Sequence, residues 1–418
     1  MHRQLCRETM CSHVRRAVHF WIPLIVGLVF LQYGCSGIGR RFKLASLYRN
    51  QEWFELRDLV TPADPAIYHA TLAYAFHNFT EAEGLARQLI DTRSGDARDA
   101  RRLLCELYAR QGRYAKALAE WQAARDAGVN LNGIEYLQAA GRRPDLEVTE
   151  RQPSALQASL EEGRFLVPVT VNGISAAFDF DTGAAESVMF EAEARRFGLT
   201  IEAAPGFVAH DAIGGVVPMG VAHVDELAIG SFRLRHVVFW VAPDSRISAS
   251  LKWRGSIGIP ILLAMETVRW RRGGVVEIGL PAKTFSPAEA NLCLDQMQIL
   301  VSAQFGGARV RGTLDSGDNR TKFFPRFQRD FPIDTRLQAG KRQITITGIS
   351  GAEHTRAMLI RDLVLTIGGK EVSFTNAPLL SRVDDDDDAR NHLVVGFDAL
   401  NAVSQATLDF RAMTLELQ

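Results

Sequence analysis

The sequence predicts a multidomain protein with α and β structure, in which an N-terminal helical-repeat segment precedes two tandem β-rich units. Residues 41–141 are rich in Ala, Leu, Arg and Glu at helical spacing and show no strand-like alternation. Beyond Pro153, short runs of Val, Ile, Phe and Thr are separated by Gly, which is typical of strands and turns. In this β-rich region the same set of sequence markers occurs twice, which indicates an internal duplication.

The composition is typical of a folded protein and does not favour a nucleic acid partner. Hydrophobic residues make up 47% of the 418 residues and charged residues 23%, as in ordinary globular domains. The 48 basic residues equal the 48 acidic residues in number, so the formal net charge is zero. Binding of nucleic acid requires a basic surface, and we therefore expect no such partner.

Residues 1–35 are typical of a targeting segment. Two arginines precede an uncharged run at residues 20–34, which is shorter than the roughly 20 apolar residues of a membrane span. The Gly-Cys-Ser sequence around Cys35 resembles the end of a bacterial lipoprotein signal, in which the cysteine becomes lipidated. Residues 32 and 33 depart from that pattern, so an uncleaved signal anchor is the alternative.

Both alternatives attach the chain to a membrane of the bacterial cell envelope, with its bulk facing the periplasm. Ser36, which follows the cysteine, resembles the sorting residue of outer-membrane rather than inner-membrane lipoproteins. A disulfide framework is not expected, because only Cys105 and Cys293 lie beyond the targeting segment.

The helical segment contains a short internal repeat. An aromatic-x-x-Ala turn occurs at residues 79–82 and again at residues 114–117, an offset of 35 residues. This resembles tetratricopeptide-like helical hairpins, whose period is about 34 residues. Such a segment would bind a peptide or a protein partner, but ordinary packed helices without a ligand account for the same pattern. Both interpretations stay open.

The markers of the duplication keep a regular spacing. Gly173 lies eight residues before Asp181, and Gly307 lies eight residues before Asp315. Each glycine ends a predicted two-residue hairpin turn, Asn-Gly or Gly-Gly, between alternating apolar runs. Further glycines follow the aspartates, first at 33 residues and then at 77 or 81 residues: Gly214 and Gly348, Gly258 and Gly396. The sequence therefore predicts one aspartate turn in each copy.

Residues 160–418 resemble the retropepsin-like aspartic proteases, specifically the bacterial forms with two such domains in one chain. The resemblance rests on Phe-Asp-Thr-Gly-Ala at residues 180–184 and on Leu-Asp-Ser-Gly at residues 314–317. It implies two β-rich retropepsin-like lobes, residues 160–285 and 296–418. These lobes would be related by a pseudo-two-fold axis and would form a cleft between them.

The resemblance also implies roles for individual residues. Asp181 and Asp315 would be the catalytic pair. The residues that support the catalytic loops would be Thr182, Gly183, Ser316 and Gly317, and the two flap tips would contain Gly214, Gly215, Gly348 and Gly351. The apolar-glycine segments at residues 257–258 and 395–396 would pack behind the catalytic loops.

The chemistry of two paired carboxyl groups agrees with this assignment independently of the family. Hydrolysis of an amide by water needs a base that activates the water and an acid that protonates the leaving nitrogen. Two carboxyl groups a few Å apart cannot both ionise, so together they supply both functions. The sequence thus predicts an aspartic endopeptidase that acts on peptide or protein substrates without a metal or cofactor. A peptide-binding protein that does not cut its ligand is the competing class.

Two acidic residues depart from the family pattern. Asp179 stands where the family has an apolar residue, and Asp318 stands where it has a small residue. One interpretation places both at a solvated cleft edge, and another has them attract a basic substrate side chain and raise the pKa of the catalytic pair. A third has these carboxylates distort the second catalytic loop, which would leave a non-catalytic copy. The aspartates at residues 384–388 predict a solvated surface loop rather than a calcium site.

Overall fold

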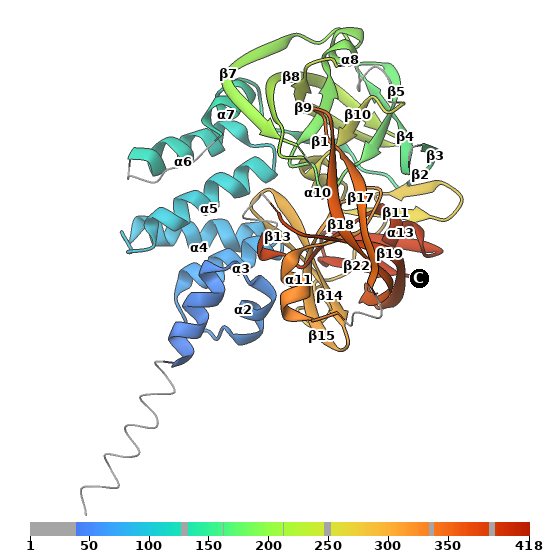
Figure 1. Cartoon of the computed structure of the whole chain (residues 1–418). Helices are drawn as coiled ribbons and strands as arrows, with labels where there is room; N and C mark the ends of the chain where they lie inside the picture. Colours follow the sequence, from blue (N-terminus) through green and yellow to red (C-terminus); the bar gives the residue numbers. More distant parts are fainter. Residues whose placement is uncertain are drawn as a thin grey trace, which may run out of the picture.

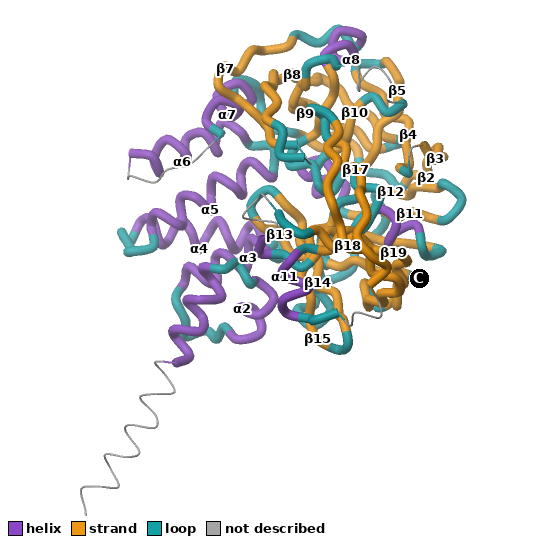
Figure 2. The backbone as a smooth tube through the Cα atoms, viewed as in Figure 1, coloured by secondary structure: helices purple, strands orange, loops and turns teal. Residues whose placement is uncertain are grey.

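The computed structural model describes residues 39–126, 133–161, 163–211, 213–245, 252–333, 338–383 and 389–418. The N-terminal helices lie together on one side of a β-rich body (Figure 1, Figure 2). The predicted targeting segment with Cys35, and the five aspartates at residues 384–388, lie outside the described residues. Within the described ranges, no helix is both long and apolar enough to cross a membrane.

Helices form the N-terminal segment, as the sequence predicts. A first helix covers residues 39–49, and it is followed by α2 (Trp53–Leu59), α3 (Ala66–Ala75), α4 (Phe79–Asp91), α5 (Ala97–Arg110), α6 (Tyr114–Asp126) and α7 (Ile134–Ala140). The two aromatic-x-x-Ala turns begin α4 and α6, and their alanines, Ala82 and Ala117, are fully buried. Small residues at these positions let neighbouring helices approach closely, and α3 packs on α4, α4 on α5 and α5 on α6.

The first large sheet contains the first copy of the markers. Its strands run in the order β1-β9-β6-β10-β5-β4-β8-β7, and β3 pairs with β4. Its elements are β1 (Glu147–Glu150), β3 (Ser159–Glu161), β4 (Arg164–Val171), β5 (Ile174–Phe180), β6 (Ser187–Phe190), α8 (Glu191–Arg196), β7 (Ile201–His210), β8 (Val216–Ile229), β9 (Phe232–Ala242), β10 (Gly255–Ile257) and α10 (Ile259–Met265). The predicted β4–β5 turn is confirmed, because Asn172 and Gly173 have φ angles of 46° and 83°, as a type I′ turn requires.

The second large sheet contains the second copy. Its strands run in the order β13-β14-β15-β20-β16-β19-β18-β17. Its elements are β13 (Leu292–Asp295), β14 (Gln298–Phe305), β15 (Ala308–Leu314), β16 (Lys322–Phe323), α11 (Pro325–Asp330), β17 (Gln338–Thr347), β18 (Ala352–Ile367), β19 (Lys370–Leu380), β20 (Leu393–Val395) and α13 (Phe397–Asn401). The β14–β15 turn is also as predicted, with φ angles of 57° at Gly306 and 82° at Gly307.

A third, five-stranded sheet takes strands from separate regions of the chain. Its order is β2-β12-β11-β21-β22, and its strands are β2 (Ser154–Gln157), β11 (Thr267–Arg271), β12 (Val275–Ile278), β21 (Gln405–Asp409) and β22 (Thr414–Leu417). Strands β11 and β21 pair antiparallel, with Thr267 opposite Asp409. This pairing joins the chain after the first large sheet to the chain after the second. Strands β1 and β2 also precede the predicted boundary at residue 160.

The two large sheets repeat one order of elements. In each, a hairpin (β4–β5 or β14–β15) leads into an aspartate turn, and a short strand and a short helix follow. A long hairpin comes next, β7–β8 or β17–β18. Finally, β10 pairs in parallel with β5, and β20 pairs in parallel with β15. The parallel pairing places a later chain segment directly beside the strand that delivers each aspartate.

Candidate active site

The two aspartate turns meet through a reciprocal set of hydrogen bonds. The backbone N–H of Thr182 donates to Ser316 Oγ (3.0 Å), and the backbone N–H of Ser316 donates to Thr182 Oγ1 (2.9 Å). The two hydroxyl groups donate in turn to carbonyls of the opposite copy, Thr182 to Leu314 (2.9 Å) and Ser316 to Phe180 (2.6 Å). Both side chains are buried. These four bonds are therefore shielded from water and fix one turn against the other.

Each aspartate lies against the glycine of the other turn. A methyl group placed on Gly183 would lie 2.5 Å from Cγ of Asp315, and one placed on Gly317 would lie 2.5 Å from Cγ of Asp181. Cβ atoms essentially never approach other heavy atoms so closely, so only glycine admits the opposing carboxyl group. The glycine of each turn thus brings Asp181 and Asp315 into one site.

Backbone N–H groups orient the two carboxyl groups. Asp181 Oδ1 accepts a hydrogen bond from the N–H of Gly183 at 2.9 Å. Asp315 Oδ1 accepts hydrogen bonds from the N–H groups of Gly317 and Asp318, both at 3.0 Å. Each carboxyl group is therefore held by its own turn while it faces the other copy.

The predicted apolar-glycine segments lie behind the turns. The backbone N–H of each aspartate donates to a carbonyl of these segments at 3.0 Å, that of Ile257 in the first copy and that of Val395 in the second. The N–H of the following glycine donates at 3.0 Å to a hydroxyl group, that of Ser187 or that of Thr321. The same support thus occurs at equivalent positions of both copies.

Burial and neighbouring charges raise the pKa of both carboxyl groups. The surrounding protein raises the pKa of Asp181 well above its ordinary value, and the charges of Asp315 and Asp179 raise it further. Burial also raises the pKa of Asp315, with a further contribution from the charge of Asp318. Both aspartates nevertheless keep partial access to solvent. Such a pair retains a proton at a pH where an isolated aspartate has lost it.

A comparison with protein families bears on the first copy. Residues 167–267 match a family model described as aspartyl protease. This range contains the Asp181 turn, the β7–β8 hairpin and the segment behind the turn. A search of curated protein sequences found no match.

Three solved structures align with the chain at low similarity. A retropepsin-like aspartic protease from Rickettsia conorii aligns with 16% identity and a TM-score of 0.24, over 32% of this chain and 92% of that chain. An aspartic proteinase from Irpex lacteus aligns with 11% identity and a TM-score of 0.38, over 63% of this chain and 96% of that chain. Basic 7S globulin from soybean aligns with 9% identity and a TM-score of 0.38, over 63% of this chain and 94% of that chain. At these TM-scores the alignments support no conclusion about this chain.

Asp179, which lies in the range of the aspartyl protease match, is buried. It is 1% exposed, and its Oδ2 accepts a hydrogen bond from Nη1 of Arg164 on β4 at 2.6 Å. The interpretation of Asp179 as a solvated residue is therefore wrong. Strand β5 lies between β4 and β10, and its last residues, including Phe178 and Phe180, are all buried. Alternation between core and solvent does not apply to a strand that is covered on both faces.

Asp318 forms an ion pair with Lys322 and is mostly buried, so its interpretation as a freely solvated residue is wrong as well. It also does not distort the second turn. Its carbonyl accepts a hydrogen bond from the N–H of Phe397 (2.7 Å), as the carbonyl of Ala184 accepts one from a backbone N–H in the first copy (3.0 Å). The second turn therefore keeps the geometry of the first, which contradicts a copy inactivated by distortion.

The predicted flap glycines lie in two hairpin turns whose tips touch. The turns β7–β8 and β17–β18 contain Gly214, Gly215, Gly348 and Gly351. In the first turn, Asp211 Oδ2 accepts hydrogen bonds from the N–H and the Oγ of Ser350 in the second turn, at 2.7 and 2.6 Å. The two hairpins therefore contact each other directly.

Sequence reasoning missed several residues of this site, among them Arg164, Asp211 and Ser350. A signal existed for Arg164, because the register fixed by the Asn-Gly turn places it at the start of β4, near Asp179 on the paired strand. Asp211 and Ser350 lie in turns without periodic pattern, and each gains its role from a partner far away in the sequence. No sequence signal indicated these two residues.

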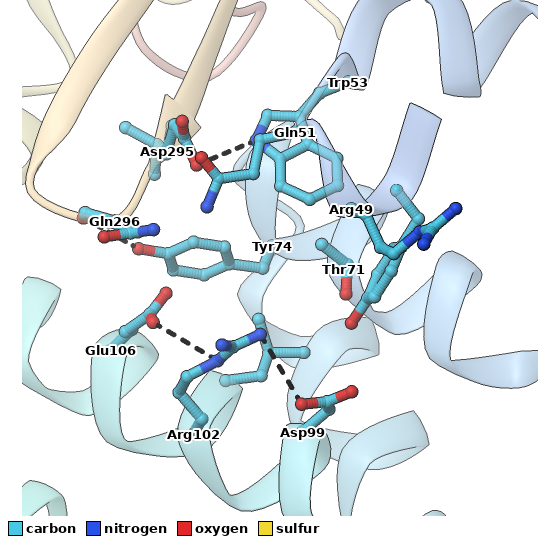
Figure 3. Close-up of a pocket in the computed structure, with 13 residues that line it drawn as sticks. Arg49, Gln51, Trp53, Thr71, Tyr74, Asp99, Arg102, Glu106, Asp295 and Gln296 are labelled. Carbon is cyan, nitrogen blue, oxygen red and sulfur yellow. Dashed lines mark hydrogen bonds and ion pairs between the residues drawn. The ribbon is translucent and has the colours of Figure 1, made fainter. Parts of the chain in front are cut away.

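A polar cavity of about 290 Å³ lies between the helices and the β13–β14 turn (Figure 3). Neither catalytic candidate lines it; its lining is Tyr48, Arg49, Gln51, Trp53, Thr71, Tyr74, Asp99, Arg102, Leu103, Glu106, Leu294, Asp295 and Gln296. Trp53 Nε1 donates to Asp295 Oδ1 (3.0 Å), and the Tyr74 hydroxyl donates to the Gln296 carbonyl (3.4 Å). These contacts connect α2 and α3 to the second large sheet.

Proposed function

We propose that the protein is an aspartic endopeptidase in which Asp181 and Asp315 activate a water molecule that attacks a peptide bond. The main support is the contact of each carboxyl group with the glycine of the opposite turn, which brings one aspartate from each copy into a single site. The aspartyl protease match over residues 167–267 supports the same chemistry.

The proposed mechanism follows from the raised pKa of the pair. With one proton shared, the ionised carboxylate takes a proton from the water, and the protonated carboxyl group donates its proton to the carbonyl oxygen of the substrate. The water oxygen bonds to the carbonyl carbon and forms a neutral tetrahedral intermediate. The carboxyl group that took the proton of the water passes it to the leaving nitrogen, while the other carboxylate takes a hydroxyl proton from the intermediate. The C–N bond then breaks and releases a carboxylic acid and an amine, and the pair again holds one proton. The titration belongs to the pair rather than to either residue.

In this proposal the two large sheets act as the lobes at residues 160–285 and 296–418, related by a pseudo-two-fold axis, with the peptide held between them. Thr182, Gly183, Ser316 and Gly317 support the catalytic loops. The turns at residues 211–215 and 348–351 act as flaps, and their contact through Asp211 and Ser350 has to open for a peptide to enter.

Incubation of residues 36–418 with a peptide library between pH 3 and pH 7 tests the activity. Asp181→Asn and Asp315→Asn should each lower turnover at least about 100-fold, because an amide neither accepts nor shares the catalytic proton. Asp225→Asn makes the same change at an exposed position of β8 and should leave turnover unchanged. Near-normal turnover in either catalytic variant would contradict a site built from both copies. Peptide binding without cleavage by the unaltered chain would favour the non-catalytic peptide-binding alternative.

We also propose that the enzyme is held in the bacterial cell envelope, facing the periplasm, by a lipid on Cys35 or by a signal anchor. The support is the sequence of residues 1–36 alone. Cys35→Ala should release the protein from the membrane fraction or block its processing, as measured by fractionation and by the mass of the mature chain. Unchanged membrane association in this variant would favour the signal anchor.

A further inference from the structure

One arginine connects the helices to both copies of the duplicated region. Arg110, the last residue of α5, is 2% exposed. Its Nη1 donates to the carbonyl of Ala185, in the loop that follows Asp181, at 2.6 Å. Its Nε donates to the carbonyl of Gln296 at 3.1 Å, and its Nη2 contacts Sδ of Met297 at 2.6 Å. Because Gln296 and Met297 form the β13–β14 turn, a single guanidinium contacts the first catalytic loop and the second large sheet.

The hydrogen-bond partners of Arg110 are neutral. Two are backbone carbonyls and the third is a thioether. The carboxyl group of Glu186 acts on Arg110 through its charge, but Glu186 accepts its hydrogen bond from Tyr114. Burial of a cation on neutral acceptors is costly unless the geometry around it is well defined. The arrangement thus favours a fixed position for the loop that contains Ala185.

A second side chain from the helices contacts the same loop. The hydroxyl of Tyr114, at the start of α6, donates to Glu186 Oε2 at 2.7 Å, and both residues are buried. The equivalent position in the second copy is Arg320, which is exposed and donates instead to the Asn376 carbonyl on β19 at 2.5 Å. The helices therefore hold the loop after Asp181, whereas the equivalent loop is held from within its own sheet.

We propose that Arg110 is a positioning residue of the active site, and that the helical segment is part of the catalytic unit. This inference rests on the proposed peptidase function. Arg110 fixes the loop at residues 181–186 against the β13–β14 turn, and so holds the carboxyl group of Asp181 opposite Gly317. Loss of this contact shifts one carboxyl group relative to the other without altering a residue that touches the peptide.

Kinetics of three variants of residues 36–418 test the proposal. Arg110→Gln removes the charge and the planar guanidinium group, and Arg110→Lys keeps the charge. Arg101→Gln is the control on the same helix. Arg101 pairs with Glu120 inside the helical segment (3.2 Å). We expect Arg110→Gln to lower kcat at least about tenfold with KM within about threefold, because small displacements of catalytic groups are costly. Arg110→Lys should recover part of kcat, and Arg101→Gln should match the unaltered protein. An unchanged kcat in Arg110→Gln, or an equal loss in Arg101→Gln, would overturn the proposal.

Hydrogen exchange supplies a readout that does not depend on activity. Backbone amides at residues 181–186 and 295–298 should exchange faster in Arg110→Gln than in Arg101→Gln, with the difference confined to these two segments. If Arg110→Gln does not fold, Arg110→Lys decides the question by the same measurement. Wild-type exchange in the folded Arg110 variants would overturn the proposal. If these amides exchange faster in Arg110→Gln but the unaltered protein cleaves no peptide, the proposed function is contradicted. The positioning of the loop by Arg110 would then still be established.

Discussion

The ion pair between Asp179 and Arg164 sets the charge beside the two catalytic candidates. Asp179 is buried, and the guanidinium carbon of Arg164 also lies 5.3 Å from the centre of the Trp253 ring. The two members act on the pKa of Asp181 in opposite directions, since Asp179 raises it and Arg164 lowers it. Because the carboxylate of Asp179 already forms an ion pair with Arg164, the hypothesis that Asp179 attracts a basic substrate side chain loses its support. Its effect on the pKa of the pair remains.

Asp179→Asn should move the upper limb of the pH–rate profile to lower pH, by about one unit or less. The change removes a negative charge that raises the pKa of Asp181, and it frees the charge of Arg164 to lower that pKa. Both effects favour earlier loss of the shared proton as pH rises. The measurement is the pH dependence of kcat at low and moderate salt, with Asp225→Asn as the control. An unchanged upper limb of the pH–rate profile in Asp179→Asn would show that the ion pair of Asp179 with Arg164 does not affect the pKa of the catalytic pair.

The two long hairpins meet at their tips, and the proposed function requires this contact to open. Strands β7 and β8 project the turn with Asp211, and strands β17 and β18 project the turn with Ser350. No residue of β17 is fully buried, and Ile344 and Ile346 are only half-buried, so packing beneath this strand is limited. Closure of the two tips therefore depends on the polar contact of Asp211 with Ser350.

Ser350→Ala should loosen the contact between the tips without breaking it. The substitution removes the hydrogen bond from Oγ and keeps the one from the backbone N–H. Loss of one such bond costs about 1 kcal/mol, so exchange of amides at residues 211–215 and 348–351 should accelerate about fivefold, and KM should change more than kcat. Ser373→Ala, at an exposed position of β19, is the matched control. Exchange equal to that of the control would contradict a closing role for this contact.

At the scale of the whole molecule, the helices dock on the β-rich body through both apolar and polar groups. Tyr136 of α7 packs on the rings of Phe207 and Trp240, and ion pairs join α2 to the second copy. Glu52 forms ion pairs with Arg311 (3.2 Å) and Arg326 (2.9 Å) of the second copy, and Arg309 pairs with Glu55 (3.2 Å) on α2. The junction with the first copy contains Arg110, Tyr114 and Glu186. Polar junctions of this kind respond to pH, and burial raises the pKa of Glu186 at the junction with the first copy to about 7.

Glu186→Gln should make the stability of the protein less sensitive to pH. Burial raises the pKa of Glu186 from 4.5 to about 7, although Arg110 and Tyr114 act in the opposite direction. Because the folded pKa is raised, the stabilisation from the bound proton is fully present below pH 4.5 and is lost as pH rises through about 7. For this shift the loss is on the order of 3 kcal/mol in the free energy of unfolding.

Denaturant unfolding at pH 5 and pH 8 measures this loss. The difference between the two pH values should be smaller in Glu186→Gln than in the unaltered protein. Glu226→Gln, whose side chain is 70% exposed on β8, should keep the full difference. The same pH dependence in all three proteins would show that Glu186 does not titrate between these values.

The sequence by itself determined the features that depend on local turn chemistry and on spacing. Asn172 and Gly173 specify a turn with positive φ at both positions, which fixes the register of β4 and β5. The repeated spacing then indicated that Asp181 and Asp315 occupy equivalent turns. Helical periodicity likewise predicted the helices of residues 41–141. These properties follow from residues close together in the chain, so a single sequence carries them.

Only the tertiary structure decided which distant residues meet. One interpretation of the sequence places Asp179 at a solvated edge, but Asp179 is buried, because its strand is covered on both faces and its carboxylate pairs with Arg164. The contact of Asp211 with Ser350 joins residues 139 positions apart, and that of Arg110 with Ala185 joins residues 75 positions apart. The residues around these positions show no sequence pattern that indicates the contacts. Polar contacts across such separations arise from the packing of whole elements rather than from the local preference of any residue.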